Sequence, residues 1–434
     1  MKKNQYAACE KEKRMKDSIK KVIVIGCGHR GGGYARIMSK SPEKFKVIAV
    51  AEPVEARRNY VGDMYDVPEN MRFTSWEPLV ALGKIADVAL VCTMDRDHFA
   101  PAVAAINAGY DLLLEKPVSP LPEECREIER LAKEKGVFVL VCHVLRYTDF
   151  YRALKRVIEQ GHLGRVVSIE AAENVGNVHQ SHSFVRGNWG NSERASFMLL
   201  QKSCHDMDIL QWLIGKKCLR IQSFGSRSYF REENAPAGAP DRCHEGCPEA
   251  ESCPYNAVKL YYESKSNWFR GAATKHPNPT DEQVMQALRT TNYGRCVFKC
   301  DNDVVDHQTV NMEFEDGITC TFSMSAFTKG GRTIHIMGTE GELFATASDT
   351  ELKIYKLKTG NTVTVPVADK EADQSIVSGH GGGDDGIINA LYELLEGRSV
   401  SSVGDITDSV DNHMIAFAAE RARLEGRVVD VSEF

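Results

Sequence analysis

The sequence lacks the features that would place the protein in a membrane or on a nucleic acid. No apolar run approaches the roughly 20 residues that a membrane-spanning helix requires. The formal net charge is −6, so there is no excess of positive charge to bind nucleic acid or an anionic membrane surface. Residues 1–21 also lack the apolar core of a secretory signal peptide. We therefore expect a cytoplasmic protein that acts on a small molecule, with no nucleic-acid or membrane partner.

Internal repeats and low-complexity tracts are absent as well, whereas cysteine is abundant, with 13 residues. Because no export signal is visible, these thiols are expected to stay reduced, which favours burial or metal binding over disulfides. A length of 434 residues favours two domains.

Strand and helix patterns alternate after a flexible leader at 1–19. Four β-branched residues at 22–25 predict a buried strand, and further strands are expected at 46–51, 88–92, 111–115 and 137–142. This alternation is typical of a parallel sheet covered by helices on both faces, in which ligands bind beyond the carboxyl ends of the strands. The sequence therefore predicts an α/β domain at 20–145.

A glycine-rich turn with dinucleotide-binding spacing follows the first strand. Gly26, Gly28 and Gly31 match G-x-G-x-x-G, which permits a tight turn, close approach of a pyrophosphate and close strand–helix packing. The N-terminus of the next helix would attract the phosphates. Glu52, at the end of the second strand, can accept both ribose hydroxyls and would repel a 2′-phosphate. This favours NAD over NADP, although the arginines at 57–58 weaken the preference.

Polar residues gather at the predicted strand ends and should converge on one crevice. All of these residues except Asp97 and His143 belong to the predicted cofactor site. That site comprises Gly26, Gly28, His29, Arg30, Gly31, Glu52, Thr93, His98, Glu115, Lys116 and Arg146.

The pattern changes after residue 145 and predicts an α+β domain at 146–434. Helices are expected at 151–159, 197–214, 384–396 and 406–425, a polar loop at 174–192, and several strands between 309 and 367. The alternation at 319–325 is typical of an antiparallel sheet with one covered face. We predict a large open-faced, mostly antiparallel sheet, with a cysteine-rich insertion at about 231–302.

Three motifs belong together in this order: Gly26-Cys27-Gly28-His29-Arg30-Gly31, Glu115-Lys116-Pro117 and Ser203-Cys204-His205-Asp206-Met207-Asp208. They resemble the Gfo/Idh/MocA family, the relatives of glucose–fructose oxidoreductase and inositol dehydrogenase. The resemblance extends over the chain from Lys20. It implies an N-terminal Rossmann domain, a C-terminal open-faced sheet, and pyranose or cyclitol substrates. It also implies a homodimer or homotetramer formed through that sheet.

Two residues are the first catalytic candidates. Lys116 at a strand end could contact both a nicotinamide ribose and a substrate hydroxyl, and stabilise the developing alkoxide. His205, on a predicted helix with carboxylates nearby, could act as a general base. The family commonly has Asp four residues before this His, where this chain has Gln201. This departure leaves either a Lys116–His205 pair or a recruited Lys202 as the catalytic set.

Other polar and aromatic residues are candidates for substrate binding. Tryptophan offers a flat apolar face to a sugar ring, and Arg and His offer partners for hydroxyls. The candidates are His179, His182, Arg186, Trp189, Gln201, Asp303, His307 and His380. For the loop residues among them, a plain loop or capping role is equally compatible with the sequence.

The cysteines of the insertion have an unusual spacing. Cys243, Cys247 and Cys253 lie within eleven residues, and Cys296 or Cys300 could complete a tetrahedral site. We predict a structural zinc bound by Cys243, Cys247, Cys253 and Cys300. A disulfide or free thiols are the alternatives, and an iron–sulfur cluster is less favoured because the spacing matches no common run.

Three functions are compatible with these observations. The leading hypothesis is an NAD(P)-dependent oxidoreductase that moves a hydride to or from a sugar, sugar derivative or cyclitol. The alternative is a redox-neutral, NAD-dependent glycoside hydrolase or lyase that oxidises its substrate transiently at C3 and eliminates the aglycone. The third is a non-catalytic NAD-sensing protein.

Overall fold

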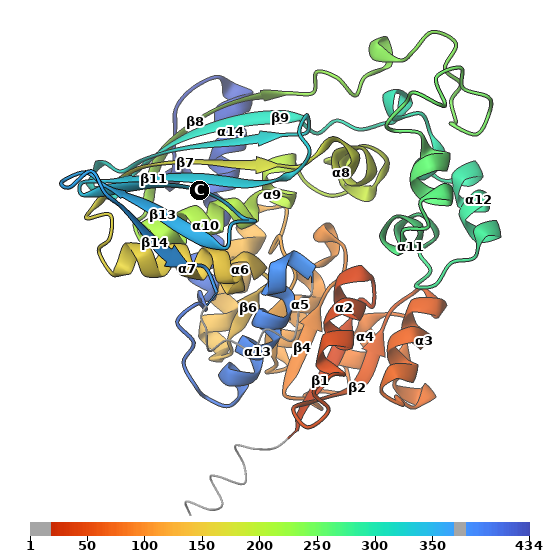
Figure 1. Cartoon of the computed structure of the whole chain (residues 1–434). Coiled ribbons are helices and arrows are strands. Elements are labelled where there is room, and N and C mark those ends of the chain that lie inside the picture. Colours follow the sequence, from red (N-terminus) through yellow and green to blue (C-terminus); the bar gives the residue numbers. More distant parts are fainter. Residues whose placement is uncertain (1–18, 369–378) are drawn as a thin grey trace, which may run out of the picture. The chain divides into compact units, whose positions relative to one another are not determined.

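The structure, a computed structural model, describes residues 19–368 and 379–434, which fall into two compact units (Figure 1). The described residues of the first unit lie within 1–118, 126–147 and 375–407. Those of the second lie within 119–125, 148–374 and 408–434.

The first unit contains a six-stranded sheet of order β3-β2-β1-β4-β5-β6 in which every neighbouring pair is parallel. Its strands are β1 (Lys20–Ile25), β2 (Phe45–Ala51), β3 (Arg72–Phe73), β4 (Val88–Val91), β5 (Asp111–Leu114) and β6 (Val139–Val141). The helices between them are α2 (His29–Met38), α3 (Glu55–Met64), α4 (Trp76–Val80), α5 (Phe99–Asn107) and α6 (Pro122–Lys135). This confirms the predicted doubly covered parallel sheet. Val22, Ile23 and Val24 are fully buried, as a strand covered on both faces requires.

One helix of this unit comes from near the end of the chain. The sequence pattern places a helix at 384–396 in the second domain, and the structure has α13 (Gly383–Leu395) there. Its Ile387, Ile388 and Leu391 belong to the same buried cluster as Val22 and Tyr34. The chain therefore returns to complete the core of the first unit, so the compact units do not follow a single boundary near residue 145.

The second unit contains a nine-stranded sheet of order β14-β13-β12-β11-β7-β10-β9-β8-β15. The strands are β7 (Val166–Asn174), β8 (Cys218–Ser226), β9 (His307–Phe314), β10 (Thr319–Ser325), β11 (Gly331–Gly338), β12 (Gly341–Thr346), β13 (Glu351–Lys356), β14 (Thr362–Pro366) and β15 (Val429–Asp430). Only the β7–β10 pair is parallel. In β10 every second residue is buried, which confirms the predicted alternation and the mostly antiparallel sheet.

Helices α7 (Asp149–Glu159) and α14 (Ile406–Glu425) lie at their predicted places in this unit, and the insertion adds α11 (Asn267–Thr274) and α12 (Asp281–Thr290). The structure corrects the continuous helix predicted at 197–214. It is divided into α9 (Met198–Gln201) and α10 (Cys204–Ile214). Ser203, the N-cap residue of α10, has φ −97° and ψ 9°, and serine favours such positions over a helix interior. The helical spacing that related Gln201 to His205 therefore does not hold.

The structure also corrects the prediction of a polar loop at 174–192, because most of this segment is helical. It folds into α8 (Asn177–Ser181), a π-helical segment at His182–Arg186 and a 3₁₀ turn at Asn188–Gly190. Among the described helices, none is both long and apolar enough to cross a membrane.

Candidate functional site

The glycine turn of the first unit has the geometry that a dinucleotide requires. Gly26 has φ +90°, and a Cβ there would lie 2.5 Å from the carbonyl oxygen of Cys92. A Cβ on Gly31 would lie 1.9 Å from the carbonyl oxygen of Gly26, so the strand and helix pack too closely for a side chain. At Gly28 the nearest atom to such a Cβ is Nη1 of Arg57, at 3.7 Å. The turn is therefore tight at its two outer glycines and open at the middle one, where a pyrophosphate could approach the backbone.

Glu52 is fixed beside this turn, directly after β2. Its Oε2 accepts the N–H of Cys27 at 2.8 Å, and its Oε1 accepts the N–H of Val54 at 2.9 Å. Arg58 donates to the carbonyl oxygen of Glu52 at 2.7 Å. Each carboxylate oxygen retains a lone pair for a further donor, as two ribose hydroxyls would supply. These residues therefore fit the adenosine half of a bound NAD.

Arg30 is part of a buried ionic cluster. Its guanidinium pairs with Glu115 (Nε to Oε1, 2.7 Å) and with Asp384 (Nη2 to Oδ1, 2.8 Å) and also contacts the hydroxyl of Tyr34. Tyr34 donates to Glu115 at 2.9 Å. Burial pushes the pKa of Glu115 upward, but the positive charges of Arg30 and Lys116 outweigh it, so the pKa lies below its ordinary value. What the structure shows for Arg30 and Glu115 is a role in joining α2, β5 and α13, and their contact with a cofactor stays a prediction.

The ends of β4 and β5 are held together near Lys116. Nδ1 of His98 lies 2.6 Å from the carbonyl oxygen of Pro117, and its Nε2 lies 3.2 Å from that of Thr93. Lys116 is half-buried, and its peptide bond to Pro117 is cis. The predicted strand-end residues Thr93, His98 and Lys116 are thus brought together. His29 is exposed at the start of α2, and Arg146 is buried just after β6.

In the second unit, a second buried ionic cluster surrounds Lys202. Glu173 on β7 and Arg332 on β11 are partners across the two strands and form an ion pair. Arg332 also donates to Asp206 of α10 (Nε to Oδ1, 2.7 Å), and Nζ of Lys202 lies 3.4 Å from Oε1 of Glu173. Lys202, a predicted catalytic residue, is therefore part of a charge network that was not predicted.

The pKa values of the two carboxylates in this network are shifted in opposite directions. Burial raises the pKa of Asp206, and the negative charge of Glu173 adds to the rise although Arg332 opposes it. Burial acts on Glu173 in the same direction, but Arg332 and Lys202 reverse the effect and lower its pKa. Glu173 is thus the stable counter-charge of Lys202. His205 is buried in α10 and directly precedes Asp206, a member of this network, in the sequence.

Gln201 holds the backbone of the 3₁₀ turn. Its Nε2 donates to the carbonyl oxygen of Trp189 at 2.6 Å, and the side chain is buried. An aspartate at this position could not make that bond, because an ionised carboxylate has no donor. The substitution that removes the family's aspartate thus has a local structural role in this chain.

Several predicted substrate residues lie in separate local networks. Nδ1 of His182 lies 2.9 Å from the hydroxyl of Tyr261, and the ring packs among Trp268, Phe269 and Tyr293. His179 meets Trp268 edge-on, with ring centroids 5.1 Å apart. These histidines are part of an aromatic cluster that joins α8 and the π-helical segment to the insertion.

Three further candidates, Asp303, His307 and Arg186, also have identified partners. Asp303 accepts the N–H of Ser192 at 2.7 Å, and Nδ1 of His307 lies 2.9 Å from Asp306. Arg186 is buried, and its guanidinium donates to the carbonyl oxygens of Arg295 and Tyr255, at 2.8 Å and 2.7 Å, and so holds the insertion. Its contact with a substrate stays a prediction. The side chain of His380 lies outside the described residues.

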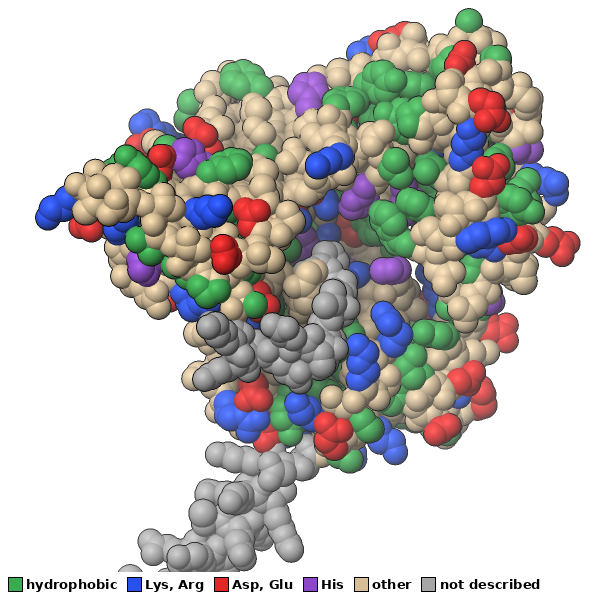
Figure 2. All heavy atoms as spheres, in the orientation of Figure 1, with side chains coloured by type: hydrophobic (Ala, Val, Ile, Leu, Met, Phe, Trp, Pro, Cys, Tyr) green, Lys and Arg blue, Asp and Glu red, His purple; other side chains and the backbone are tan. Residues whose placement is uncertain are grey.

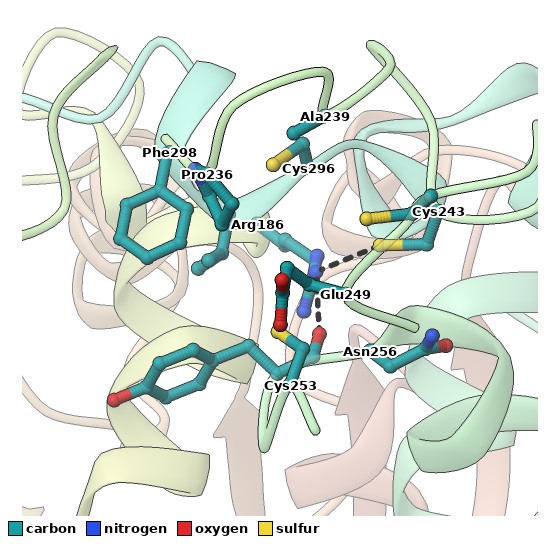
Figure 3. A pocket seen from close by; sticks show the side chains of 12 residues that line it. Arg186, Pro236, Ala239, Cys243, Glu249, Cys253, Asn256, Cys296 and Phe298 are labelled. Carbon is teal, nitrogen blue, oxygen red and sulfur yellow. Dashed lines mark hydrogen bonds between the residues drawn. The ribbon is translucent and has the colours of Figure 1, made fainter. Parts of the chain in front are cut away.

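The zinc predicted at Cys243, Cys247, Cys253 and Cys300 is not supported. Within 19–368 and 379–434, no three or more His, Cys, Asp or Glu side chains are placed to hold a metal ion. The cysteines of the insertion are free thiols, and Cys296 rather than Cys300 joins the other three around a cavity (Figure 3).

Sequence reasoning missed Glu173 and Arg332. No local motif marks them, because each acts through a partner that is distant in the chain. Asp206 had a visible signal, since it directly follows His205 in the third motif.

Comparison with protein families gives two matches along the chain. Residues 20–143 match the Gfo/Idh/MocA oxidoreductase family model for an NAD-binding Rossmann fold. Residues 155–431 match the model for the C-terminal alpha/beta domain of the same family.

Curated relatives include enzymes of sugar and cyclitol chemistry. The oxidoreductase YteT of Bacillus subtilis is 26% identical over 319 residues, which cover 70% of this chain and 72% of YteT. Inositol 2-dehydrogenase of Corynebacterium glutamicum is 24% identical over 46% of this chain and 56% of the relative. The 2,7-anhydro-N-acetylneuraminate hydratase of Mediterraneibacter gnavus is 26% identical over 44% of this chain and 48% of the relative. The chain thus spans about half the length of the last two relatives.

Solved structures share the fold over nearly the whole chain. Levoglucosan dehydrogenase in complex with NADH is 17% identical, with a TM-score of 0.69 over 95% of this chain and 99% of that one. Scyllo-inositol dehydrogenase of Lactobacillus casei, with bound NAD(H) and scyllo-inositol, is 16% identical, with a TM-score of 0.64 and the same coverage. Because the two family models together cover most of the sequence, this chain belongs to the Gfo/Idh/MocA oxidoreductase family and is an enzyme with an NAD-binding Rossmann domain.

Proposed function

We propose that the protein is an NAD-dependent dehydrogenase acting on a sugar, sugar derivative or cyclitol. The observation that carries the cofactor choice is Glu52, which is fixed by two backbone N–H groups beside the open position at Gly28. A carboxylate there favours a ribose diol and disfavours a 2′-phosphate. The substrate class is supported by the relatives named inositol 2-dehydrogenase and levoglucosan dehydrogenase.

The catalytic roles in this proposal follow from the charges of the side chains. Bound NAD would supply the hydride acceptor. Lys116 would donate a hydrogen bond to the substrate hydroxyl and stabilise the negative charge that develops on its oxygen. His205 would accept the hydroxyl proton. Lys202, held by Glu173, would contribute a fixed positive charge or serve as a further proton-transfer group.

A redox-neutral reaction is the second candidate. Gln201 replaces the family's aspartate and is engaged with the backbone at Trp189, and one relative is named a hydratase. In this reaction, oxidation at C3 acidifies the C2–H bond, a base removes that proton, and the aglycone leaves from C1. Water then adds and the hydride returns to C3, so that no cofactor is consumed. Lys202 or His205 would supply the second proton transfer.

One experiment separates these reactions. The full chain is incubated with NAD or NADP and a panel of cyclitols, free sugars and aryl glycosides, and both NADH and released p-nitrophenol are measured. Accumulation of NADH supports the dehydrogenase. Release of p-nitrophenol without net NADH, with solvent deuterium entering C2, supports the redox-neutral reaction. Tight NAD binding without either product contradicts both reactions and favours the third hypothesis, a non-catalytic NAD-sensing protein.

The outer face of the nine-stranded sheet supports a homodimer or homotetramer. Phe224, Phe344 and Tyr355 lie on β8, β12 and β13 and are 57%, 64% and 43% exposed. The strand register places all three on the same face of the sheet. Exposed apolar residues on one face are typical of an interaction surface. We propose that a second copy of the chain covers it.

A further inference from the structure

Four thiols of the insertion line one cavity of about 20 Å³. They belong to Cys243, Cys247, Cys253 and Cys296, and Arg186 lines the same cavity. Figure 3 shows Cys243, Cys253 and Cys296 near the guanidinium of Arg186. The neighbouring Cys300 does not line the cavity, and its Sγ instead lies 3.4 Å from the carbonyl oxygen of Cys296. The fold thus brings Cys296 to the same cavity as the three cysteines at 243–253, although about 40 residues separate them in the sequence.

Arg186 gives this cavity a buried positive charge. The residue is 2% exposed, and its Nη2 lies 3.6 Å from Sγ of Cys243. Its guanidinium also donates to two neutral carbonyl groups and interacts with the neutral hydroxyl of Tyr261, and its Nη1 is buried without a hydrogen-bond partner in the described chain. Glu249 also lines the cavity, but it is exposed and its carboxylate accepts the hydroxyl of Ser252. Because an arginine stays protonated, a guanidinium buried in this way requires an anionic partner.

Metal-bound thiolates would provide that anion. Four cysteine thiolates around iron or zinc carry a net negative charge, and their sulfurs accept N–H bonds from neighbouring groups. A single zinc needs four sulfurs about 2.3 Å from one centre, whereas no three described ligand side chains here are placed to hold one ion. In a [4Fe–4S] cluster each cysteine binds a different iron, so its four thiolate sulfurs lie farther apart than around a single zinc ion.

We propose that Cys243, Cys247, Cys253 and Cys296 bind an iron–sulfur cluster, with Arg186 as its buried counter-charge and hydrogen-bond donor. The cluster ties the insertion to the π-helical segment that carries Arg186. The sequence spacing matches no common iron–sulfur run and so disfavoured a cluster, but the shared cavity and the buried cation outweigh it. The proposal is independent of the proposed dehydrogenase, because its readout is metal content and not turnover.

The test is metal analysis of the full-length protein purified without oxygen. Iron, zinc and acid-labile sulfide are measured per chain, together with the visible absorbance that thiolate-bound iron produces. We expect iron and sulfide in equal amounts and an absorbance that bleaches with dithionite. Zinc without sulfide, or no iron even after reconstitution with ferrous iron and sulfide, overturns the proposal.

Variants assign the ligands. Cys→Ser at each of positions 243, 247, 253 and 296 should abolish most of the iron binding, whereas Cys300→Ser and the sheet variant Cys320→Ser should retain it. NAD binding and circular dichroism report whether each variant folds. If the ligand variants do not fold, the Mössbauer spectrum of the wild-type protein decides instead, since all irons should then have sulfur ligands only. Iron lost in Cys300→Ser but kept in Cys296→Ser contradicts the assignment.

Discussion

At the residue scale, Glu52 has a structural role and, in the proposed function, also selects the cofactor. Both of its carboxylate oxygens accept a backbone N–H, from Cys27 and Val54, and each keeps a lone pair for a cofactor hydroxyl. The arginines at 57–58 supply positive charge close by, with Arg57 near Gly28 and Arg58 on the carbonyl group of Glu52. Cofactor preference is therefore a balance between one carboxylate and two guanidinium groups.

The variant Glu52→Ser tests this balance. We expect NAD affinity to fall about 10- to 100-fold, because hydrogen bonds to a charged group contribute about 1.5–3 kcal/mol. NADP affinity should stay or rise, since the repulsion of a 2′-phosphate is removed. Titration calorimetry with both cofactors measures the ratio, and Glu55→Gln at the start of α3 is the matched control. An equal loss for both cofactors contradicts the assigned role.

Lys116 is the second residue whose role can be isolated. In Lys116→Met we expect kcat to fall about 10²- to 10³-fold, the usual loss when a donor to a developing oxyanion is removed. The dissociation constant of NAD should change only a few-fold. Steady-state kinetics and cofactor titration separate the two effects, and the exposed Lys46→Met serves as control. Unchanged turnover with a weakened NAD complex would make Lys116 a binding residue only.

At this scale the sequence identified which side chains lie at the strand ends, but it did not identify the ion pairs that other side chains form. Thr93, His98 and Lys116 could be predicted to meet, because the carboxyl ends of neighbouring parallel strands share one edge of the sheet. The contact of Arg332 with Glu173 and Asp206 could not, since it depends on the register of β7 and β11 and on where α10 begins.

At the element scale, three elements of the first unit are held together by an ionic cluster. Arg30, Glu115 and Asp384 form this cluster, which links α2, the end of β5 and α13. The cluster explains why α13 belongs to a core otherwise built from the first part of the chain. It also couples the stability of this unit to pH, because Glu115 is buried and ionised.

The variant Glu115→Gln tests this coupling. The folded pKa of Glu115 is lowered from 4.5, so its contribution is complete above that pH and is lost as the pH falls through the folded value. We expect the variant to lower the free energy of unfolding by about 3–5 kcal/mol at neutral pH, because it leaves Arg30 with one buried charge fewer. The difference should shrink in acid.

Urea unfolding followed by NAD binding at neutral and acidic pH measures this effect. The exposed Glu123→Gln on α6 is the control, and we expect its stability to match that of the wild type at both values. A deficit in Glu115→Gln that does not change with pH would show that the lost packing, and not the charge, is responsible.

The elements themselves were predictable where their patterns are regular. The strand at 319–325 and the helix at 406–425 have the predicted bounds. The helix at 197–214 was not predictable in this form, because its apolar spacing continues across the non-helical Ser203. The short helices in 174–192 show no helical spacing of apolar residues. They are held by contacts with the insertion, which the local sequence does not reveal.

At the scale of the whole molecule, the predicted fold classes of both units are confirmed, whereas the return of the chain through α13 was not foreseen. Such a return leaves no signal in the sequence, because the helix is amphipathic whichever core it covers. The proposed assembly through the exposed outer face of the large sheet also belongs to this scale.

The variant Phe344→Asp tests the assembly. A charge on this face should be disfavoured in an apolar interface and shift the protein toward monomers, as measured by light scattering after size-exclusion chromatography. Leu82→Asp, at an exposed position of the first unit, should leave the assembly unchanged. A wild-type protein that is monomeric at micromolar concentration would contradict the proposed dimer or tetramer.

The most direct test of the account is a crystal structure of the full chain with NAD. The account predicts the pyrophosphate against the backbone at Gly28, both adenosine ribose hydroxyls on Glu52, and the nicotinamide ribose within hydrogen-bond distance of Nζ of Lys116. A dinucleotide bound elsewhere, or an ammonium group of Lys116 directed into solvent away from the nicotinamide, would contradict it.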